Sequence, residues 1–100
     1  MRRYEVMFIV KPDLDDSGLQ QQMDKIKKSV SKHKGEVEEL SFWQKRELAY
    51  PINKIKEGIY LLGYFKLPEQ GPQELSQEWR LDSNILRFLI LKKERRNGKS

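Results

Sequence analysis

Residues 45–58 join the two halves of this chain, and they read KRELAYPINKIKEG. Three apolar residues alternate along one side of an extended segment here: Leu48, Tyr50 and Ile52. Pro51 has no N–H group to donate, so this strand must end at the edge of a sheet or run beyond it. Residues 53–58 then turn the chain, with Gly58 free to take the positive φ that ends such a connection. These features predict an exposed β-hairpin arm that contacts a binding partner. The alternative is an ordinary polar hairpin loop.

Segments with strand and helix periodicity alternate on both sides of the arm. Apolar residues repeat at every second position in strands, and at every third or fourth position in helices. On this basis we predict four strands, at residues 3–10, 37–48, 59–67 and 85–93. Two helices are predicted between them, at residues 17–34 and 72–80. The order of these elements is βαββαβ.

Polar residues and a glycine mark the ends of the first helix. Ser17 and Gln20 have the spacing of a capping box. Asp15 and Asp16 suit the positive end of the helix dipole. Gly35 is expected to end the helix as its C′ residue.

Pro72 is expected at the start of the second helix, because proline is favoured at the first helical position. Leu75 and Trp79 then form its buried i, i+4 pair.

Two similar βαβ halves result, and each crossover is right-handed by default. We therefore predict an α+β fold, a ferredoxin-like sandwich in which a four-stranded antiparallel sheet carries both helices on one face. A chain of 100 residues has room for one domain. We expect that domain to comprise residues 1–93, followed by a short basic tail at residues 94–100 that is disordered from residue 97.

The two faces of the predicted sheet are both apolar. The residues expected to pack together beneath the helices come from strands and helices alike: Tyr4, Val6, Phe8, Leu61, Phe65, Phe88 and Ile90 against Leu19, Met23, Ile26, Val30, Leu75 and Trp79. The opposite, open face is expected to carry seven large side chains: Met7, Ile9, Tyr60, Leu62, Tyr64, Leu89 and Leu91. A contiguous apolar patch of this kind usually marks the binding site of a partner.

The charge of the chain is concentrated at its C-terminal end. The net charge is +5, and residues 85–100 carry six Lys and Arg against a single Glu. This asymmetry favours a polyanionic partner, with phosphate as the favoured group, although basic tails that are merely solvated are common. The chain has no cysteine, which excludes disulfides and thiolate metal sites. No apolar run approaches the length of a membrane span.

Few residues suggest catalysis or metal binding. Part of a calcium-loop spacing is present in a group that helix capping explains better: Asp13, Asp15, Ser17, Gly18 and Asp24. His33 is the only histidine, and its position among lysines at a helix end predicts a surface residue and no ligand. An acylphosphatase-like enzyme would need a cationic, glycine-rich first loop, whereas residues 12–16 are acidic. An RNA-recognition-motif module shares the element order and stacks bases on sheet aromatics, with Tyr60 and Tyr64 as candidates.

Several motifs resemble one family, that of bacterial small-subunit ribosomal protein number six. The arm carries the strongest of them, Arg46-Glu47-Leu48-Ala49-Tyr50-Pro51-Ile52 with Lys54 following, and Gly58-Ile59-Tyr60 opens the next strand. The start, Met1-Arg2-Arg3-Tyr4-Glu5, is also similar, and the resemblance continues to about Lys93. Gln44 stands where the family usually has glycine, so a bulge expected there is absent or differently made. Gly71-Pro72 is unusual as well and bears on where the second helix starts.

The resemblance implies a structural ribosomal protein, bound to the ribosome in the cytoplasm, without catalytic activity, cofactor, membrane contact or small-molecule substrate. It implies binding to the central domain of small-subunit ribosomal RNA together with small-subunit ribosomal protein number eighteen. The residues expected to contact RNA are cations: Arg2, Arg3, Arg46, Lys54, Lys56, Arg87, Lys92 and Lys93. The residues expected to contact the protein partner are apolar or aromatic: Met7, Ile9, Leu48, Tyr50, Ile52, Tyr60, Leu62, Tyr64, Leu89 and Leu91.

Overall fold

The computed structural model of the protein describes residues 1–52 and 54–93. Six elements follow one another along the chain: β1 (Arg2–Val10), α1 (Asp16–Lys32), β2 (Glu36–Ile52), β3 (Ile55–Leu67), α2 (Gly71–Arg80) and β4 (Ile85–Lys93). This order confirms the predicted βαββαβ arrangement. The predicted basic tail lies outside the described residues. Neither helix has the length and apolar character needed to cross a membrane.

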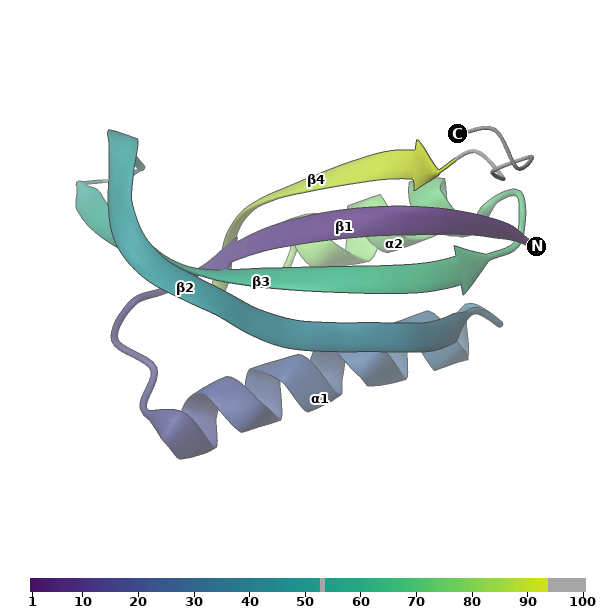
Figure 1. The fold of residues 1–100 in the computed structure, drawn as a ribbon, viewed down its shortest axis with the longest axis horizontal. Coiled ribbons are helices and arrows are strands. Elements are labelled where there is room, and N and C mark those ends of the chain that lie inside the picture. Colours follow the sequence, from purple (N-terminus) through teal and green to yellow (C-terminus); the bar gives the residue numbers. More distant parts are fainter. Residues whose placement is uncertain (53, 94–100) are drawn as a thin grey trace.

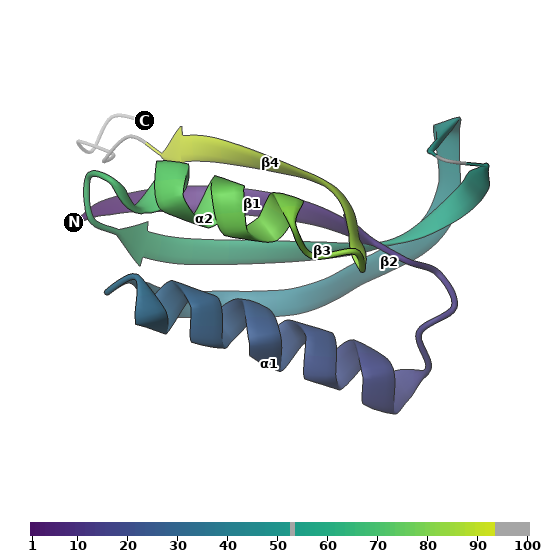
Figure 2. The same ribbon diagram turned by 180° about the vertical axis from the view of Figure 1, so that it is seen from behind.

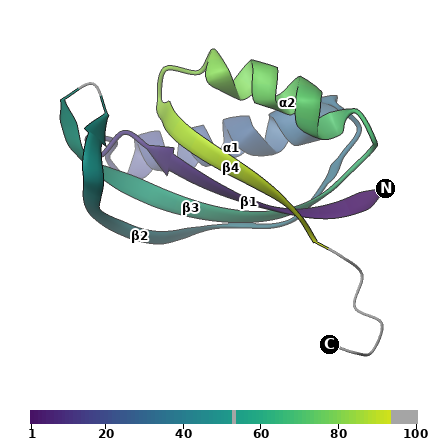
Figure 3. The ribbon, with the colours of Figure 1, turned by 90° about the horizontal axis from the view of Figure 1, so that it is seen from above.

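The four strands form one antiparallel sheet in the order β2-β3-β1-β4, so β1 is central and β4 is an edge (Figure 1). Both helices lie on the same face, with α1 running along the β2 side and α2 along the β4 side (Figure 2). Seen along the sheet, none of the described helices lies on the opposite face (Figure 3). The ferredoxin-like prediction is therefore confirmed, and one face of the sheet is left uncovered by the described part of the chain.

The core forms between the helices and the covered face of the sheet. In β1 the side chains alternate strictly, with Tyr4, Val6, Phe8 and Val10 buried. Trp79 of α2 packs edge to face against Phe8, with 4.8 Å between the ring centroids. Five buried core residues were absent from the predicted set: Val10, Leu40, Ile59, Leu67 and Ile85. Four predicted core residues are only partly buried against the cluster: Leu19, Met23, Phe88 and Ile90.

Helix α1 begins one residue earlier than predicted and has a different cap. Asp15 is the N-cap, and its carboxylate accepts a hydrogen bond of 2.7 Å from the backbone N–H of Gly18. The predicted capping box at Ser17 is therefore wrong, because Ser17 already lies within the first turn. Aspartate serves both purposes at this position, since it bonds an unpaired N–H and its charge suits the helix dipole.

The end of α1 is closed by a residue other than the predicted glycine. Lys34 takes the left-handed conformation with φ of 66°. Its N–H donates to the carbonyl of Ser31, and the next N–H, of Gly35, donates to the carbonyl of Val30. This pair of bonds is a Schellman motif with Lys34 as its C′ residue. Gly35 is needed for another reason, because a Cβ there would lie 2.6 Å from Leu67 Cδ2.

Helix α2 starts at Gly71, so Pro72 lies within the first turn, where a missing N–H costs nothing. Leu75 and Trp79 are both buried, which confirms the predicted pair. The indole N–H of Trp79 donates to the hydroxyl of Ser29, 3.0 Å away on α1. This bond satisfies the polar atom of an otherwise apolar contact between the two helices.

His33 lies near the surface at the end of α1, and its ring contacts two carboxylates of α2. Its Nδ1 lies 3.1 Å from Glu74 Oε1, and its Nε2 lies 2.9 Å from Glu78 Oε1. The hydrogen bond with His33 is the main cause that lowers the pKa of the Glu78 carboxyl, with a smaller contribution from Lys32. His33 therefore links the end of α1 to α2. Across residues 1–52 and 54–93 there is no group of three or more His, Cys, Asp or Glu side chains that could hold a metal ion.

The cap of α1 gives a direct test of this description. Replacing Asp15 with Ala leaves the Gly18 N–H without its acceptor, and should lower the free energy of unfolding by about 0.5 to 2 kcal/mol. Ser17→Ala is the matched control, and it should change stability by less than about 0.5 kcal/mol. Urea denaturation of the three proteins measures both effects. A larger loss for Ser17→Ala than for Asp15→Ala would contradict the assignment of the cap.

Candidate macromolecular interface

The open face of the sheet consists of side chains from β1, β3 and β4 in register. Met7 lies opposite Leu62 on one side and Leu89 on the other. Glu5 lies opposite Tyr64 and Leu91 in the next row. Leu89 is 56% exposed and Leu91 48% exposed, whereas the predicted interface residues of β1 and β3 are half-buried by their neighbours. The structure thus brings together seven of the predicted partner residues: Met7, Ile9, Tyr60, Leu62, Tyr64, Leu89 and Leu91.

Gly58 connects this face to the arm. It is buried within β3 and lies opposite Arg46, so the prediction that it ends the turn is wrong. A Cβ at Gly58 would collide with Ile9 Cγ2 and would lie 3.4 Å from Leu48 Cδ2. Ile9 and Leu48 therefore fill the space that a side chain at residue 58 would need. The positive φ that the sequence assigned to Gly58 belongs to Lys54, at 69°.

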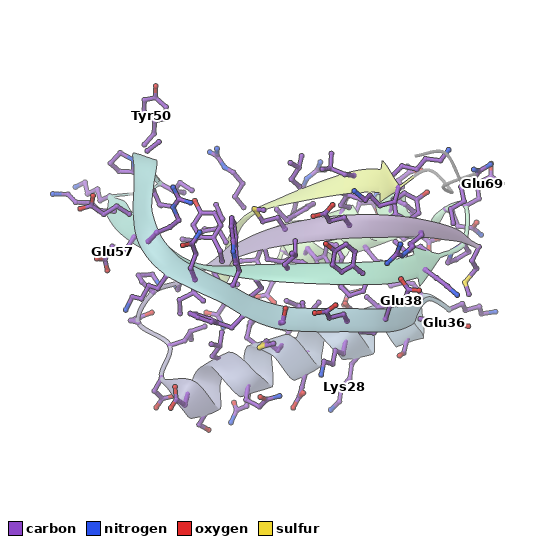
Figure 4. All side chains as sticks on the ribbon, in the orientation of Figure 1. Lys28, Glu36, Glu38, Tyr50, Glu57 and Glu69 are labelled. Carbon is purple, nitrogen blue, oxygen red and sulfur yellow. The ribbon has the colours of Figure 1, made fainter. Side chains whose placement is uncertain are left out.

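The two strands of the arm are longer, and the turn between them is shorter, than predicted. Strand β2 continues to Ile52 and β3 resumes at Ile55, and these two residues pair across the turn. The arm extends past the end of the sheet that lies away from both termini and curves toward the helix side (Figures 1 and 3). Tyr50 projects from its end and is 83% exposed (Figure 4). Pairing is irregular between Glu47 and Ile52, so the simple alternation of arm residues predicted from the sequence is interrupted.

A bulge in β2 places an aromatic residue that the sequence analysis missed. The register with β3 shifts between Phe42 and Gln44, which leaves Trp43 as the extra residue. The Trp43 ring meets the Tyr60 ring edge to face, with 5.9 Å between the centroids. The bulge is thus present with Gln44 in the place of the family's usual glycine. Alternation alone cannot assign Trp43 to a face, because the extra residue shifts the phase.

Two arginines cover the tyrosine rings of the open face. The guanidinium carbon of Arg3 lies 5.4 Å from the centroid of the Tyr64 ring. That of Arg46 lies 5.6 Å from the centroid of the Tyr60 ring. Both distances are within the range of cation–π attraction. These guanidinium groups therefore occupy positions over the rings where a nucleotide base would otherwise stack.

Three cations form a row across the sheet at the end where β1 begins, and two glutamates form ion pairs with them. Arg3 lies opposite Lys66 on β3 and Lys93 on β4. Glu38 pairs with Arg3 at 2.7 Å and with Lys66 at 3.8 Å. Glu5 pairs with Lys93 at 3.1 Å. Much of the positive charge predicted for RNA at Arg3 and Lys93 is therefore balanced within the protein.

The other predicted RNA-binding cations are exposed and far less balanced. Within residues 1–52 and 54–93, none of these lies within 4.0 Å of a carboxylate oxygen: Arg2, Arg46, Lys54, Lys56, Arg87 and Lys92. Arg87 lies opposite Ile9, at the other end of the sheet from Lys93. Lys54 and Lys56 belong to the arm near that same end. The available cations near the open face are thus concentrated at its arm end. Arg2 and Lys92 lie at the other end of the sheet and on its helix-packed side, since they are opposite the buried residues Leu67 and Tyr4.

Comparison with known proteins identifies the family. A sequence profile described as Ribosomal protein S6 matches residues 3–92. The chain belongs to the ribosomal protein S6 family. It is 41% identical over 95 residues to the small ribosomal subunit protein bS6 of Clostridium acetobutylicum, which covers 95% of this chain and 100% of that relative. The protein of the same name from Desulforamulus reducens is 42% identical over 92 residues, with 92% and 97% covered.

A solved member of the S6 family has the same fold. The crystal structure of 30S ribosomal protein S6 from Thermotoga maritima gives a TM-score of 0.83 at 30% identity, over 92% of this chain and 87% of that chain. The predicted family and the predicted fold are both confirmed. The relatives are structural ribosomal proteins, so the prediction that this chain is not an enzyme is confirmed by its family.

The close contact at Gly58 can be tested by adding one methyl group. Gly58→Ala should destabilise the protein by about 1 to 3 kcal/mol, because the new Cβ overlaps Ile9 Cγ2 in the packed sheet. The same substitution in an Ile9→Ala background should cost clearly less, since that background removes the overlapping methyl. Denaturant unfolding of the four proteins measures this coupling. Equal costs in both backgrounds would show that Ile9 does not fill the space at Gly58.

Proposed function

We propose that this protein is a structural component of the small ribosomal subunit, bound to the ribosome in the cytoplasm. In this proposal a single domain of residues 1–93 binds the central domain of small-subunit ribosomal RNA together with small-subunit ribosomal protein number eighteen. The protein partner covers the open face of the sheet, and the cations around that face contact RNA phosphates. Membership of the S6 family supports the ribosomal role.

The observation that carries the proposal is the uncovered apolar face. Both helices pack on one side of the sheet, so no described element covers the other side (Figure 3). Leu89 and Leu91 nevertheless place two large apolar side chains there, each about half exposed. Burying such a side chain fully is worth about 1.5 to 3 kcal/mol. A protein partner that covers the exposed half of each side chain would gain about half of that free energy.

The free cations support RNA as the second partner. Arg87, Lys54 and Lys56 are exposed and make no ion pair with any carboxylate in the described part of the chain. Lysine and arginine side chains of this kind bind phosphate oxygens and release the counterions condensed on nucleic acid. Contacts to phosphate fix position without reading sequence, which suits a structural role in an assembly.

The alternative of an RNA-recognition-motif module is less favoured by the geometry. Such a module stacks unpaired bases on open aromatic faces of the sheet. Tyr60 and Tyr64 are the candidate platforms here, and each has an arginine guanidinium over its ring. Trp43 also meets Tyr60 edge to face. A base would have to displace these groups before it could stack.

The open face can be tested by placing one charge in it. Leu62→Asp should weaken binding to small-subunit protein number eighteen by about 2 kcal/mol or more, the cost typical of a buried anchor. Thermal unfolding should change little, because Leu62 lies outside the helix-packed core. Leu81→Asp is the control, since Leu81 is exposed at the end of α2 and away from this face. Calorimetric titration measures both affinities, and equal loss of stability and pairing for Leu62→Asp would refute the assignment of the face.

The RNA contact can be tested through its dependence on salt. Removing one phosphate-binding cation should reduce the magnitude of the slope of log affinity against log salt by about 0.7 to 0.9. Arg87→Ala should show this change in binding of the protein pair to central-domain RNA. Arg80→Ala is the control, because Arg80 is an exposed cation on α2, on the far side of the sheet. An unchanged slope and normal affinity for Arg87→Ala would remove that residue from the RNA site.

A further inference from the structure

Strand β4 forms one edge of the sheet, and among the described residues its only strand neighbour is β1 (Figures 1 and 2). The backbone N–H and C=O groups on its outer side therefore have no ladder partner within residues 1–52 and 54–93. An edge of this kind can accept a further strand, unless charged side chains, a proline or a bulge prevent the pairing.

The middle of β4 has none of these protective features. Residues 88–91 read FLIL, and they contain no charge, no proline and no shift of register with β1. The one irregularity in this pairing lies at the start of the strand, between Ile85 and Arg87. By contrast, charged residues occur along most of the other edge strand, β2, whose pairing with β3 is shifted at three places. An apolar run on an exposed edge favours pairing with another chain.

The residues of β4 are self-complementary in one antiparallel register. Two copies paired about a two-fold axis at Leu89 bring all nine residues of the strand into pairs. Every cation of one copy then lies opposite an apolar residue of the other: Arg87 opposite Leu91, Lys92 opposite Leu86 and Lys93 opposite Ile85.

The neighbouring registers are less favourable. An axis at Ile90 would set Arg87 opposite Lys93, and like charges directly opposite each other destabilise a sheet. An axis at Phe88 would leave Lys92 and Lys93 outside the paired strands. The charges of β4 therefore favour the axis at Leu89.

This register also brings apolar side chains together on both faces of the sheet. On the helix side, Phe88 of each copy lies opposite Ile90 of the other, and an aromatic residue beside a β-branched one is a favourable cross-strand pair. Trp79 contacts the Phe88 ring edge to face, with 5.6 Å between the centroids, so that ring is already held in place. On the open face, the half-exposed Leu89 of one copy lies opposite Leu89 of the other.

We propose that two copies of this chain pair edge to edge through β4, antiparallel about Leu89, and form a dimer with one continuous sheet. The contact is the same on both copies, so it closes with two of them. Its area is that of a single strand edge, so the dimer is weak and depends on concentration. The net charge of +5 on each copy opposes association, and salt that screens this repulsion strengthens the pairing. Neither RNA nor the proposed protein partner is required, so this inference is independent of the proposed function.

The test places charges at the two-fold axis. Sedimentation of the purified protein, freed of nucleic acid and studied up to about 1 mM, measures the dissociation constant of the dimer. Leu89→Lys and Leu89→Glu should each weaken association about tenfold or more, because two like charges then face each other in place of two leucines. An equimolar mixture of these variants should restore pairing, since lysine then lies opposite glutamate. Leu81→Lys is the matched control, because Leu81 is exposed at the end of α2.

A further variant separates edge pairing from stacking of two open faces. Leu62 lies on β3, which β1 separates from the β4 edge. Leu62→Lys should leave the dissociation constant within about twofold of the parent, because distant sites act independently. Thermal unfolding establishes that each variant is folded. If a Leu89 variant does not fold, hydrogen exchange of the parent decides the question, since amides of residues 85–93 should exchange more slowly as the concentration rises while those of β2 stay unchanged.

Four results would overturn the proposal. The first is a parent protein that stays monomeric up to about 1 mM in salt that screens its charge. The second is an equal loss of association for Leu62→Lys and Leu89→Lys, because the copies would then meet through their open faces. The third is a mixture of the Leu89 variants that associates no better than either alone. The fourth is association that weakens as salt is added, which would indicate bridging by nucleic acid.

Discussion

The packing of both helices on one face of the sheet is the constraint on which the rest of the structure depends. Trp79 makes this packing possible, because its ring fills the space beside Phe8 while its N–H bonds to Ser29 of the other helix. Once α1 and α2 lie on the same side, the other side of β1, β3 and β4 has no partner within the described chain. The apolar alternation of those strands then produces an uncovered apolar surface, of the kind that usually marks a binding site.

The cations predicted to contact RNA differ in how far neighbouring carboxylates balance their charge. Arg3, Lys66 and Lys93 share one end of the sheet with Glu38 and Glu5, and the resulting ion pairs balance much of the charge of these three cations. Solvent-exposed pairs of this kind contribute at most modest stability. Within residues 1–52 and 54–93, the cations without an ion pair on the open side of the sheet therefore lie mainly near Arg87 and the arm.

The fold was largely predictable, because alternation with period two is strong in the central strands. The predicted fourth strand coincides with β4, and the first differs from β1 by a single residue. The interruptions were not predictable. A register shift between Val37 and Glu39 and a bulge at Trp43 change the phase of β2, so Leu40 and Trp43 could not be assigned to faces. Sequence also cannot show close approaches, such as the one between Ile9 and Gly58 that makes glycine necessary within a strand.

The most direct test of the central claim is to measure whether the open face becomes covered when the proposed protein partner binds. Hydroxyl-radical footprinting reads side-chain exposure, and Leu89 and Leu91 are large, exposed targets on this face. Leu81 is 87% exposed at the end of α2 and serves as the internal reference. We expect Leu89 and Leu91 to be protected when protein number eighteen binds, before RNA is added, while the reactivity of Leu81 stays unchanged. Equal reactivity of Leu89 and Leu91 in the free protein and in the complex would contradict the account.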